Sequence, residues 1–471
     1  MGYRDPRPLI FDADVMPMAI QRGQVEVIIT IRTPLSSGIL SRASQAAEAQ
    51  ANKRALAAVL TDAGVRRPMQ DLSRLGALVG HMNAAELRAL RGNADARLLS
   101  VQLNKPIAVA QLTTSTVSSN FTSAWAAGYR GAGQNIVVMD TGVQSNHKFL
   151  QGANGLGKVV YEACFGTNSS IGNINYESNC PNQVGTSGDS PPGMIGSAAP
   201  RINCLSTTNP YHLACHHGTH VAGIAAGRHS SAFQQGFQGV ANEANLIAMQ
   251  VFSFDKQAGA VPGVFQADLL GALQLLVNAV DTAAKNPYTV NLSLGGNIYG
   301  SACANTSAAI ANAVQSLYAA GVPVIAATGN AGSREGVAWP ACIPRIIKVG
   351  AVENTDKTPS IASFTNLGLP LNYPGDFFWM APGGSNATSI TSSVNGTVAV
   401  NGWMQDTIGM RGTSQAAPHV AGLYALIKAA VPGVGVNDIS NWIQANASVA
   451  LPAVSVSGSS VSFRRVRVPN F

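Results

Sequence analysis

Apolar and polar positions follow two different patterns along the chain, and the change falls near residue 120. Before it, β-rich stretches at 25–33, 75–82 and 98–103 alternate with an alanine-rich stretch of helical spacing at 44–60. A second, shorter helix would run to Leu90 with Asn83 as its cap. This order of strand, helix, strand, helix, strand predicts a small α+β domain with helices packed on one face of a sheet.

From about residue 121 onward, continuous apolar stretches of strand length are separated by stretches of helical length. Such strands are typical of a parallel sheet that is covered on both faces. We expect strands at 136–139, 246–251, 289–294, 322–327 and 346–352, and helices at 264–284 and 307–320. Residues 165–213 are rich in Gly, Asn, Ser and Pro and would form a long irregular segment, called the excursion below. Residues 453–468 would form a hairpin that turns near Gly458.

Composition fits a compact globular protein, since the 471 residues are 46% hydrophobic and only 11% charged. The length allows two or three domains. The formal charge is +7, but the first 105 residues hold 14 Lys/Arg against 9 Asp/Glu, so the rest is nearly neutral. We therefore expect no nucleic-acid or membrane partner, and we interpret Arg464, Arg465 and Arg467 as a solvated strand face.

The first 20 residues are too charged for a secretory signal, and no apolar run of about 18 residues predicts a membrane span.

The cysteines all lie in the middle of the chain, and their even number favours disulfides, which imply an oxidising compartment. They are Cys164, Cys180, Cys204, Cys215, Cys303 and Cys342. About 15 pairings are open to six cysteines, and the near-neighbour pairing would join 164 to 180, 204 to 215 and 303 to 342. A competing interpretation takes Cys204, His212, Cys215 and His216 as zinc ligands, although their spacing matches no compact metal motif.

Three glycine-flanked segments place an acid, an imidazole and a hydroxyl in that order: VVMDTGV around Asp140, HHGTHVAG around His217 and RGTSQAAPHVAG around Ser414. A serine hydroxyl needs a base to become a nucleophile, and the base needs a carboxylate to fix its tautomer. Asp140 would sit at the carboxyl edge of the sheet, where ligand sites of open α/β sheets form. A strand-end Asp alone is more often a cap or turn residue, so the combination of the three segments carries the prediction.

The neighbours of these residues carry weaker predictions. Gly218 and Gly223 would allow close approach of the backbone near His217, and His220 would be a buried, hydrogen-bonded histidine. Ser414 would start a helix, where free N–H groups favour negative charge. Pro418 would fall near the end of the first turn, where a missing N–H has little effect.

These segments, their order and their spacing resemble the subtilisin-like serine proteases, the subtilase family, most strongly over residues 121–430. The resemblance implies a three-layer α/β parallel-sheet catalytic domain, in which Asp140 orients the base, His217 takes the proton and Ser414 attacks the carbonyl. The segment ATGNAG supplies Asn330 as the oxyanion-hole amide beside the Ser414 N–H. The segment NLSLGG would place Ser293, Leu294, Gly295 and Gly296 along the substrate cleft, and Ala338 would floor a pocket for bulky apolar side chains.

The resemblance also implies a serine endopeptidase made as a self-processing zymogen. Residues 1–108 would be a ferredoxin-like α+β propeptide, an inhibitor and folding aid, and residues 109–471 the catalytic domain. Processing would fall between Lys105 and Leu112. Expected partners are extended polypeptide substrates and the propeptide itself, with a monomeric, secreted enzyme whose signal peptide is outside this chain.

Two departures from the family pattern matter. Catalysis in the family needs no cofactor, but its strongest calcium site takes an Asp shortly after the catalytic Asp, where this chain reads SNHKFLQG with Phe149 near that place. The loop 228–238 also lacks a carboxylate, so we expect that calcium site to be missing. Where many relatives have methionine after the nucleophile, this chain has Gln415, which predicts tolerance of peroxide.

Two other function classes stay open at this stage. A peptide ligase or cyclase on the same fold would pass the acyl group to an amine, and a noncatalytic binding protein would keep the fold without turnover. All four catalytic positions are intact, which disfavours the binder. A sedolisin-type acid protease, with Glu in place of His217, is also disfavoured.

Overall fold

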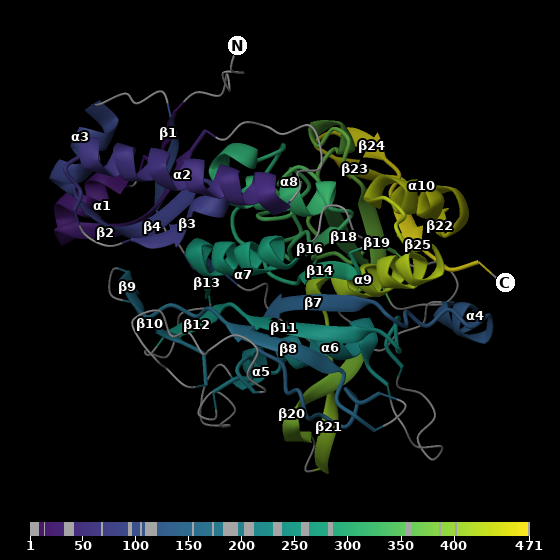
Figure 1. Cartoon of the computed structure of the whole chain (residues 1–471). Coiled ribbons are helices and arrows are strands. Elements are labelled where there is room, and N and C mark those ends of the chain that lie inside the picture. Colours follow the sequence, from purple (N-terminus) through teal and green to yellow (C-terminus); the bar gives the residue numbers. More distant parts are fainter. Residues whose placement is uncertain are drawn as a thin grey trace.

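The computed structural model describes residues 9–13, 15–32, 42–66, 69–92, 97–103, 106–108, 120–152, 155–171, 174–181, 196–201, 212–228, 238–255, 263–280, 286–353, 360–385, 388–400 and 403–469. An N-terminal unit lies against one side of a larger unit built around a long sheet (Figure 1). None of the helices in these ranges is long and apolar enough to cross a membrane.

The N-terminal unit has a five-stranded sheet in the order β1-β5-β2-β4-β3. Its strands are β1 (Ile10–Phe11), β2 (Gln24–Ile31), β3 (Gln70–Leu72), β4 (Ala77–Asn83) and β5 (Leu98–Leu103), and its helices are α1 (Val15–Arg22), α2 (Arg42–Asp62) and α3 (Ala84–Gly92). Asn83 caps α3 as predicted, because its Oδ1 accepts from the N–H groups of Ala85 at 2.9 Å and Glu86 at 3.0 Å. The order β5-β2-β4-β3 is ferredoxin-like, with β1 added at the edge.

Alternation along β2 gives this sheet two buried faces. Val27, Ile29 and Ile31 pack with the three helices of the same unit, including Leu56 of α2. Ile28 points the other way and joins the apolar core that contains α7 (Gln266–Ala279) and α8 (Ala308–Ala319) of the larger unit. The N-terminal unit is therefore held to the larger one by a continuous apolar core.

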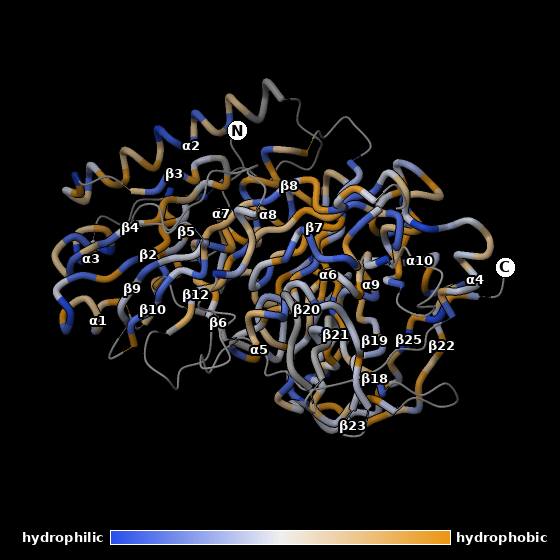
Figure 2. Tube along the Cα trace, turned by 90° about the horizontal axis from the view of Figure 1, so that it is seen from below, coloured by the Kyte–Doolittle hydropathy of each residue, from blue (hydrophilic) through white to orange (hydrophobic). Residues whose placement is uncertain are grey.

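The larger unit is organised by a nine-stranded sheet in the order β22-β25-β19-β18-β16-β14-β7-β11-β8, parallel except for the edge strand β22. The strands are β7 (Asn135–Asp140), β8 (Val159–Cys164), β11 (Asn245–Gln250), β14 (Tyr288–Leu292), β16 (Val324–Ala327), β18 (Ile346–Val352), β19 (Phe378–Pro382), β22 (Ser448–Ala450) and β25 (Arg464–Val466). The apolar character of the central strands is plain in Figure 2. All five strands that the sequence predicts in this sheet are present, within two residues at each end.

Helices cover both faces of this sheet, which gives three layers. Along β7, Val137 and Met139 face α7 and α8, whereas Ile136 and Val138 face α6 (His217–Ala226), α9 (Thr413–Ala430) and α10 (Val436–Asn446). The short α4 (Phe121–Ala126) lies at the end of this second layer. The expected three-layer α/β architecture with a parallel sheet is thus confirmed.

Two disulfides follow the near-neighbour pairing: Cys164–Cys180 and Cys303–Cys342, with Cα–Cα distances of 5.7 and 5.3 Å. Cys215 is also disulfide-bonded, so the zinc interpretation is wrong for this residue. Cys204, its expected partner, lies outside the described residues. The first disulfide ties β8 to the strands of the excursion, β9 (Ser169–Ile171) and β10 (Ile174–Ser178).

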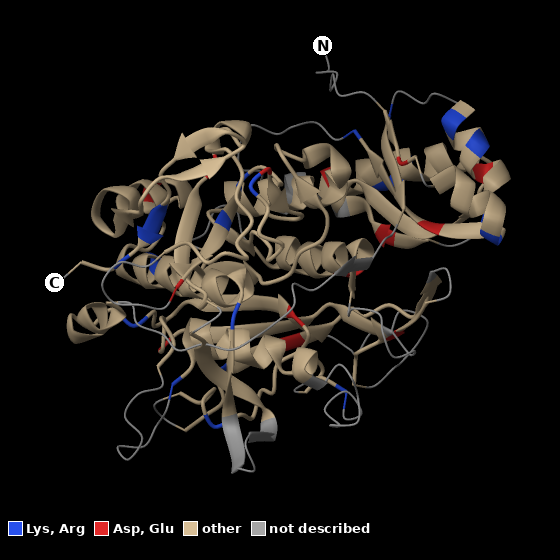
Figure 3. Ribbon diagram, turned by 180° about the vertical axis from the view of Figure 1, so that it is seen from behind, with Lys and Arg blue, Asp and Glu red and all other residues tan. Residues whose placement is uncertain are grey.

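The C-terminal tail forms the expected hairpin of β23 (Val454–Val456) and β24 (Ser459–Val461), turning at Ser457 and Gly458 with φ of 47° and 78°. The interpretation of the basic trio as a solvated face is wrong for two of its members. Arg464 donates to Ser448 Oγ at 2.7 Å, and Arg465 is only 7% exposed, because β25 is inserted between β22 and β19. Elsewhere in the described chain, Figure 3 shows Lys and Arg scattered among Asp and Glu.

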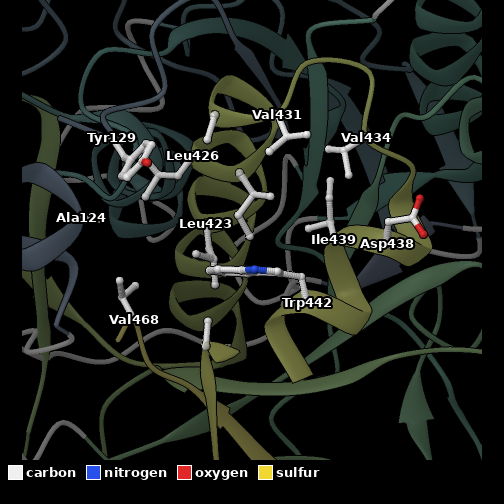
Figure 4. Close-up of a pocket in the computed structure, with 13 residues that line it drawn as sticks. Ala124, Tyr129, Leu423, Leu426, Val431, Val434, Asp438, Ile439, Trp442 and Val468 are labelled. Carbon is white, nitrogen blue, oxygen red and sulfur yellow. The ribbon is translucent and has the colours of Figure 1, made fainter. Parts of the chain in front are cut away.

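An apolar cavity of about 380 Å³ lies between α9, α10 and the tail (Figure 4). Its lining includes Leu423, Val431, Trp442 and Val468. It lies along the second half of α9, whereas Ser414 is at the start of that helix. This cavity is therefore separate from the candidate site.

Candidate active site

The structure brings Asp140 and His217 together, although they are 77 residues apart in sequence. Asp140 ends β7 and His217 begins α6, and Asp140 Oδ1 lies 2.6 Å from His217 Nδ1. Both side chains are fully buried. A carboxylate at Nδ1 holds the proton there and leaves Nε2 as the basic atom. No described residue is hydrogen-bonded to that Nε2, so the base is available.

Two glycines allow the strand end and the helix start to approach so closely. A methyl group at Gly218 would overlap the carbonyl oxygen of Gly142, and Gly142 itself has a φ of +112°. Thr141 Oγ1 accepts from the Gly218 N–H at 3.1 Å, which fixes the helix start beside the strand. The predicted role of Gly218 in close backbone approach is confirmed.

Ser414 is the second residue of α9, as the sequence predicts, but the expected effect of Pro418 is wrong. Pro418 is the sixth residue of α9, so its missing N–H is the one that would bond the Ser414 carbonyl. The Ser293 hydroxyl donates to this carbonyl instead, at 2.7 Å. A residue from the predicted cleft segment thus compensates for the proline and ties the backbone of Ser414 to the end of β14.

The contact between nucleophile and base is not closed in this structure. Ser414 Oγ donates to the Ser293 carbonyl at 3.3 Å rather than to His217. Helices α6 and α9, which carry the two residues, pack against each other. Catalytic hydrogen bonds are often long or unformed in active sites without substrate, so this open contact is compatible with a pairing of Ser414 and His217.

Asn330 is oriented by contacts to the residue before Ser414. Its Oδ1 accepts from the Thr413 N–H at 2.8 Å and from Thr413 Oγ1 at 2.9 Å. Because the oxygen end of the amide is held there, Nδ2 points away, and it has no partner among the described residues. The Ser414 N–H is also free of intrahelical bonds by its position in the first turn. Two N–H donors are thus available beside the serine.

The cleft differs in part from the prediction. Strand β14 ends at Leu292, so Ser293, Leu294, Gly295 and Gly296 follow the strand rather than extend it to 294. In a separate sheet, β13 (Gly263–Phe265) pairs antiparallel with β6 (Pro106–Ala108) on one side and with β12 (Phe252–Asp255) on the other. Sequence reasoning missed β13 because its two apolar residues, Val264 and Phe265, merge with the helical pattern of the predicted helix at 264–284.

Ala338, which the sequence predicts to floor a pocket, lies close to Gly295 and Gly329. Methyl groups added at Gly295 and Gly329 would come within 3.2 and 2.9 Å of Ala338 Cβ. These three small residues therefore converge, and any larger side chain at one of them would take the space between them.

A hairpin that the sequence did not predict is hydrogen-bonded to α6, the helix that carries His217. It consists of β20 (Ile390–Val400) and β21 (Trp403–Met410), and His220 Nε2 lies 2.9 and 3.1 Å from the carbonyls of Ile390 and Ile408. Burial lowers the pKa of His220 to about 3, so its ring is neutral at pH 7, and the predicted structural role is confirmed. Ser392 and Ser393 donate to the carbonyls of His220 and Thr219, at 2.7 and 2.9 Å.

The described residues near Phe149 do not fit the family's strong calcium site. Phe149 is 5% exposed, packs beside the ring of His147 and offers no oxygen side-chain ligand. Close by, the buried Lys158 ammonium donates to the carbonyl of Ala226, at the end of α6, and to that of Asn242 at 2.7 Å. Burial lowers the pKa of Lys158 to about 7. The described residues hold no group of three His, Cys, Asp or Glu that could bind a metal, and 229–237 lie outside them.

We expect chelator to leave the melting temperature nearly unchanged, because the segment around Phe149 lacks the carboxylate that a strong calcium site needs. The measurement is differential scanning calorimetry of the purified protein with and without EDTA, followed by calcium add-back. A fall of more than about 2–4 °C, the shift that about 1 kcal/mol gives in a domain of roughly 150–250 residues, together with recovery on add-back, would refute the expectation.

A serine at a helix start, beside a buried aspartate–histidine pair at the edge of a parallel sheet, is the arrangement of serine hydrolases. The profile of the subtilase family matches residues 131–464. The chain therefore belongs to the subtilase family of serine proteases.

Individual relatives agree with this assignment. The chain is 29% identical to subtilisin DY of Bacillus licheniformis over 327 residues, which cover 69% of this chain and 86% of that protein. It is 34% identical to subtilisin NAT of Bacillus subtilis subsp. natto over 226 residues, which cover 47% of this chain and 48% of that protein. The solved structure of the S41 psychrophilic protease superposes with a TM-score of 0.51 at 27% identity, over 76% of this chain and 100% of the other.

Gln415 predicts tolerance of peroxide, because no thioether lies next to the nucleophile that oxidation could convert to a sulfoxide. We expect wild type to retain its activity on a chromogenic peptide after dilute peroxide, and the Gln415→Met variant to lose it progressively. Equal loss in both proteins, with the cysteines unmodified by mass spectrometry, would contradict the prediction.

Proposed function

We propose that this protein is a serine endopeptidase that hydrolyses extended polypeptide chains through an acyl-enzyme at Ser414. The observation that carries the proposal is the fully buried pair of Asp140 and His217, joined at 2.6 Å with Nε2 left as the base. A buried imidazole held in this tautomer can accept the proton of a neighbouring hydroxyl and so make it a nucleophile.

In the proposed mechanism, Ser414 Oγ attacks the carbonyl carbon while His217 Nε2 takes its proton. Asp140 stabilises the resulting imidazolium. The carbonyl oxygen becomes an oxyanion that accepts from the Ser414 N–H and from Asn330 Nδ2. His217 then returns the proton to the leaving amine as the carbon–nitrogen bond breaks, and water releases the acyl group by the same steps in reverse order.

We further propose that residues 1–108 act as an inhibitory propeptide and that the chain processes itself between Lys105 and Leu112. The antiparallel pairing of β6 with β13 supports this, because a peptide held as an added strand is the expected mode of substrate binding in such a cleft. The apolar packing of Ile28 against the larger unit supports tight binding of the unit that precedes β6. The proposed processing range overlaps Lys105 and residues 109–112, which lie outside the described residues.

The remaining features of the proposal concern setting and specificity. The disulfides support a secreted enzyme in an oxidising compartment. We propose a monomer that needs no cofactor for catalysis. The convergence of Ala338 with Gly295 and Gly329 supports a pocket with a small, neutral floor and a preference for bulky apolar side chains.

Product analysis tests this function directly. The purified protein is incubated with a model peptide and an added acceptor amine, and the products are examined by mass spectrometry, while a fluorophosphonate probe labels the reactive serine. We expect free carboxyl termini and labelling at Ser414. New amide bonds to the acceptor would indicate a ligase, and absence of both cleavage and labelling would indicate a noncatalytic binder.

A further inference from the structure

The side-chain amide of Gln415 is buried without a hydrogen-bond partner. Gln415 has no exposed surface, and neither its Oε1 nor its Nε2 is bonded to a described residue. Its backbone is fully engaged, because its N–H donates to the Gly412 carbonyl at 3.1 Å and its carbonyl lies 2.8 Å from His419 Nδ1. A buried amide without a partner destabilises the folded protein, and a hydrogen bond to the bound substrate would satisfy it.

This amide lies beside that of Asn330. A methyl group added at Gly412 would be 2.9 Å from Asn330 Nδ2 and 3.1 Å from Gln415 Oε1. The two amides therefore border the same small space on one side of Gly412, two residues before the nucleophile. No hydrogen bond joins them, since Asn330 Nδ2 and both polar atoms of Gln415 are unpartnered among the described residues.

We propose that Gln415 is a further catalytic donor for the proposed peptidase reaction. A half-turn of its terminal amide exchanges Oε1 and Nε2, so that Nε2 faces the space it shares with Asn330. There it donates a hydrogen bond to the oxyanion as the bond between Ser414 Oγ and the carbonyl carbon forms. The oxyanion then has three donors: the Ser414 N–H, Asn330 Nδ2 and Gln415 Nε2. No proton is transferred to or from Gln415.

The size of the effect follows from how firmly each donor is held. Loss of one oxyanion-hole amide costs about 10²–10³-fold in kcat, a value established for the corresponding asparagine of subtilisin. Two bonds to Thr413 fix Asn330 before substrate arrives, whereas no hydrogen bond fixes the amide of Gln415. We therefore expect a smaller contribution from Gln415, about tenfold in kcat, with little change in KM because the bond strengthens only in the transition state.

The inference rests on the proposed function, and its test uses the full chain after processing, with active sites counted by fluorophosphonate titration. Gln415→Met keeps the length of the side chain but removes the donor, and we expect a kcat about tenfold lower at unchanged KM. Gln274→Met makes the same change at another buried glutamine, on α7, and we expect it to keep the kcat of wild type.

Gln415→Glu separates a donor from a space-filling residue. Where its carboxyl is ionised, the negative charge repels the oxyanion, so we expect kcat to fall there by about 100-fold or more. Burial raises the pKa of a carboxyl at this position, so the measurement extends into the alkaline range. As the pH falls, the protonated carboxyl becomes a donor, and the ratio of variant to wild-type kcat should rise. Taking this ratio at each pH cancels the pH dependence that both proteins share, including that of His419, whose ring contacts the Gln415 carbonyl.

The possible outcomes are distinct. A kcat of Gln415→Met within twofold of wild type, or a Gln415→Glu ratio that does not change with pH, overturns the role of Gln415 while leaving the proposed function intact. A wild-type protein that neither labels nor cleaves peptide overturns both. Loss of kcat in Gln274→Met equal to that in Gln415→Met would assign the effect to general disturbance of the fold and would also overturn the inference.

Discussion

Replacing Ser414 with alanine is expected to lower kcat for peptide hydrolysis by about 10⁶-fold, the size seen for the matching serine of subtilisin. The variant lacks the nucleophile, while the donors of Asn330 and the backbone remain. The loss should be accompanied by failure of self-processing, so that the purified variant remains a single chain of 48.6 kDa. Wild type should instead give a large fragment whose N-terminus falls between Lys105 and Leu112.

The measurements are turnover of a chromogenic peptide, intact mass and N-terminal sequencing of the large fragment. Ser316→Ala serves as a matched control, because it removes a serine hydroxyl from an exposed position on α8. Adding active wild type to the Ser414→Ala protein tests whether the processing point is accessible in the uncleaved chain. Processing of Ser414→Ala at the normal rate by itself would contradict the assignment of Ser414 and of self-processing together.

Replacing Asp140 with asparagine is expected to lower kcat by about 10⁴-fold while leaving the fold intact. The carboxylate accepts from His217 Nδ1 at 2.6 Å and from the Thr141 N–H at 2.7 Å, with no exposed surface. Asparagine has the same shape, but its NH₂ end offered to Nδ1 favours the tautomer that protonates Nε2. The base then has no lone pair directed at the serine.

The test of Asp140→Asn combines kcat with the rate of fluorophosphonate labelling, since both need the basic Nε2. Circular dichroism and melting temperature establish that the variant is folded. Asp438→Asn, on the rim of the apolar cavity, is a control with the same change of charge at a distance from His217. Labelling of Asp140→Asn at the wild-type rate would show that Asp140 does not orient the base.

Sequence alone predicted the elements whose pattern is regular over many residues. The alanine-rich α2, the apolar strands β7, β11, β16 and β18, and the capped α3 were all foreseen, because each is specified by its own residues. The pairing of Asp140 with His217 was foreseen from the chemistry of the two segments. The 2.6 Å distance between Asp140 Oδ1 and His217 Nδ1 depends on the close approach of Gly142 and Gly218. The glycine residues flanking the two segments indicated this approach in the sequence.

The rest could not be predicted because it depends on partners distant in sequence. Strand β25 carries Arg464 and Arg465, with Arg467 directly after it, and it lies in the sheet between β22 and β19. The compensation of Pro418 by Ser293 joins residues 125 positions apart. The hairpin of β20 and β21 is rich in Ser, Thr and Gly, and its partners lie on the histidine helix.

This hairpin can open on heating before the main sheet unfolds, and the active site depends on it. Its strands are bonded to His220 and Thr219 at one place, and β21 ends at Met410, four residues before Ser414. Local opening of a two-stranded ribbon needs less free energy than unfolding of a nine-stranded sheet. Opening of the hairpin would displace base and nucleophile relative to each other, so thermal inactivation should begin while the secondary structure is still intact.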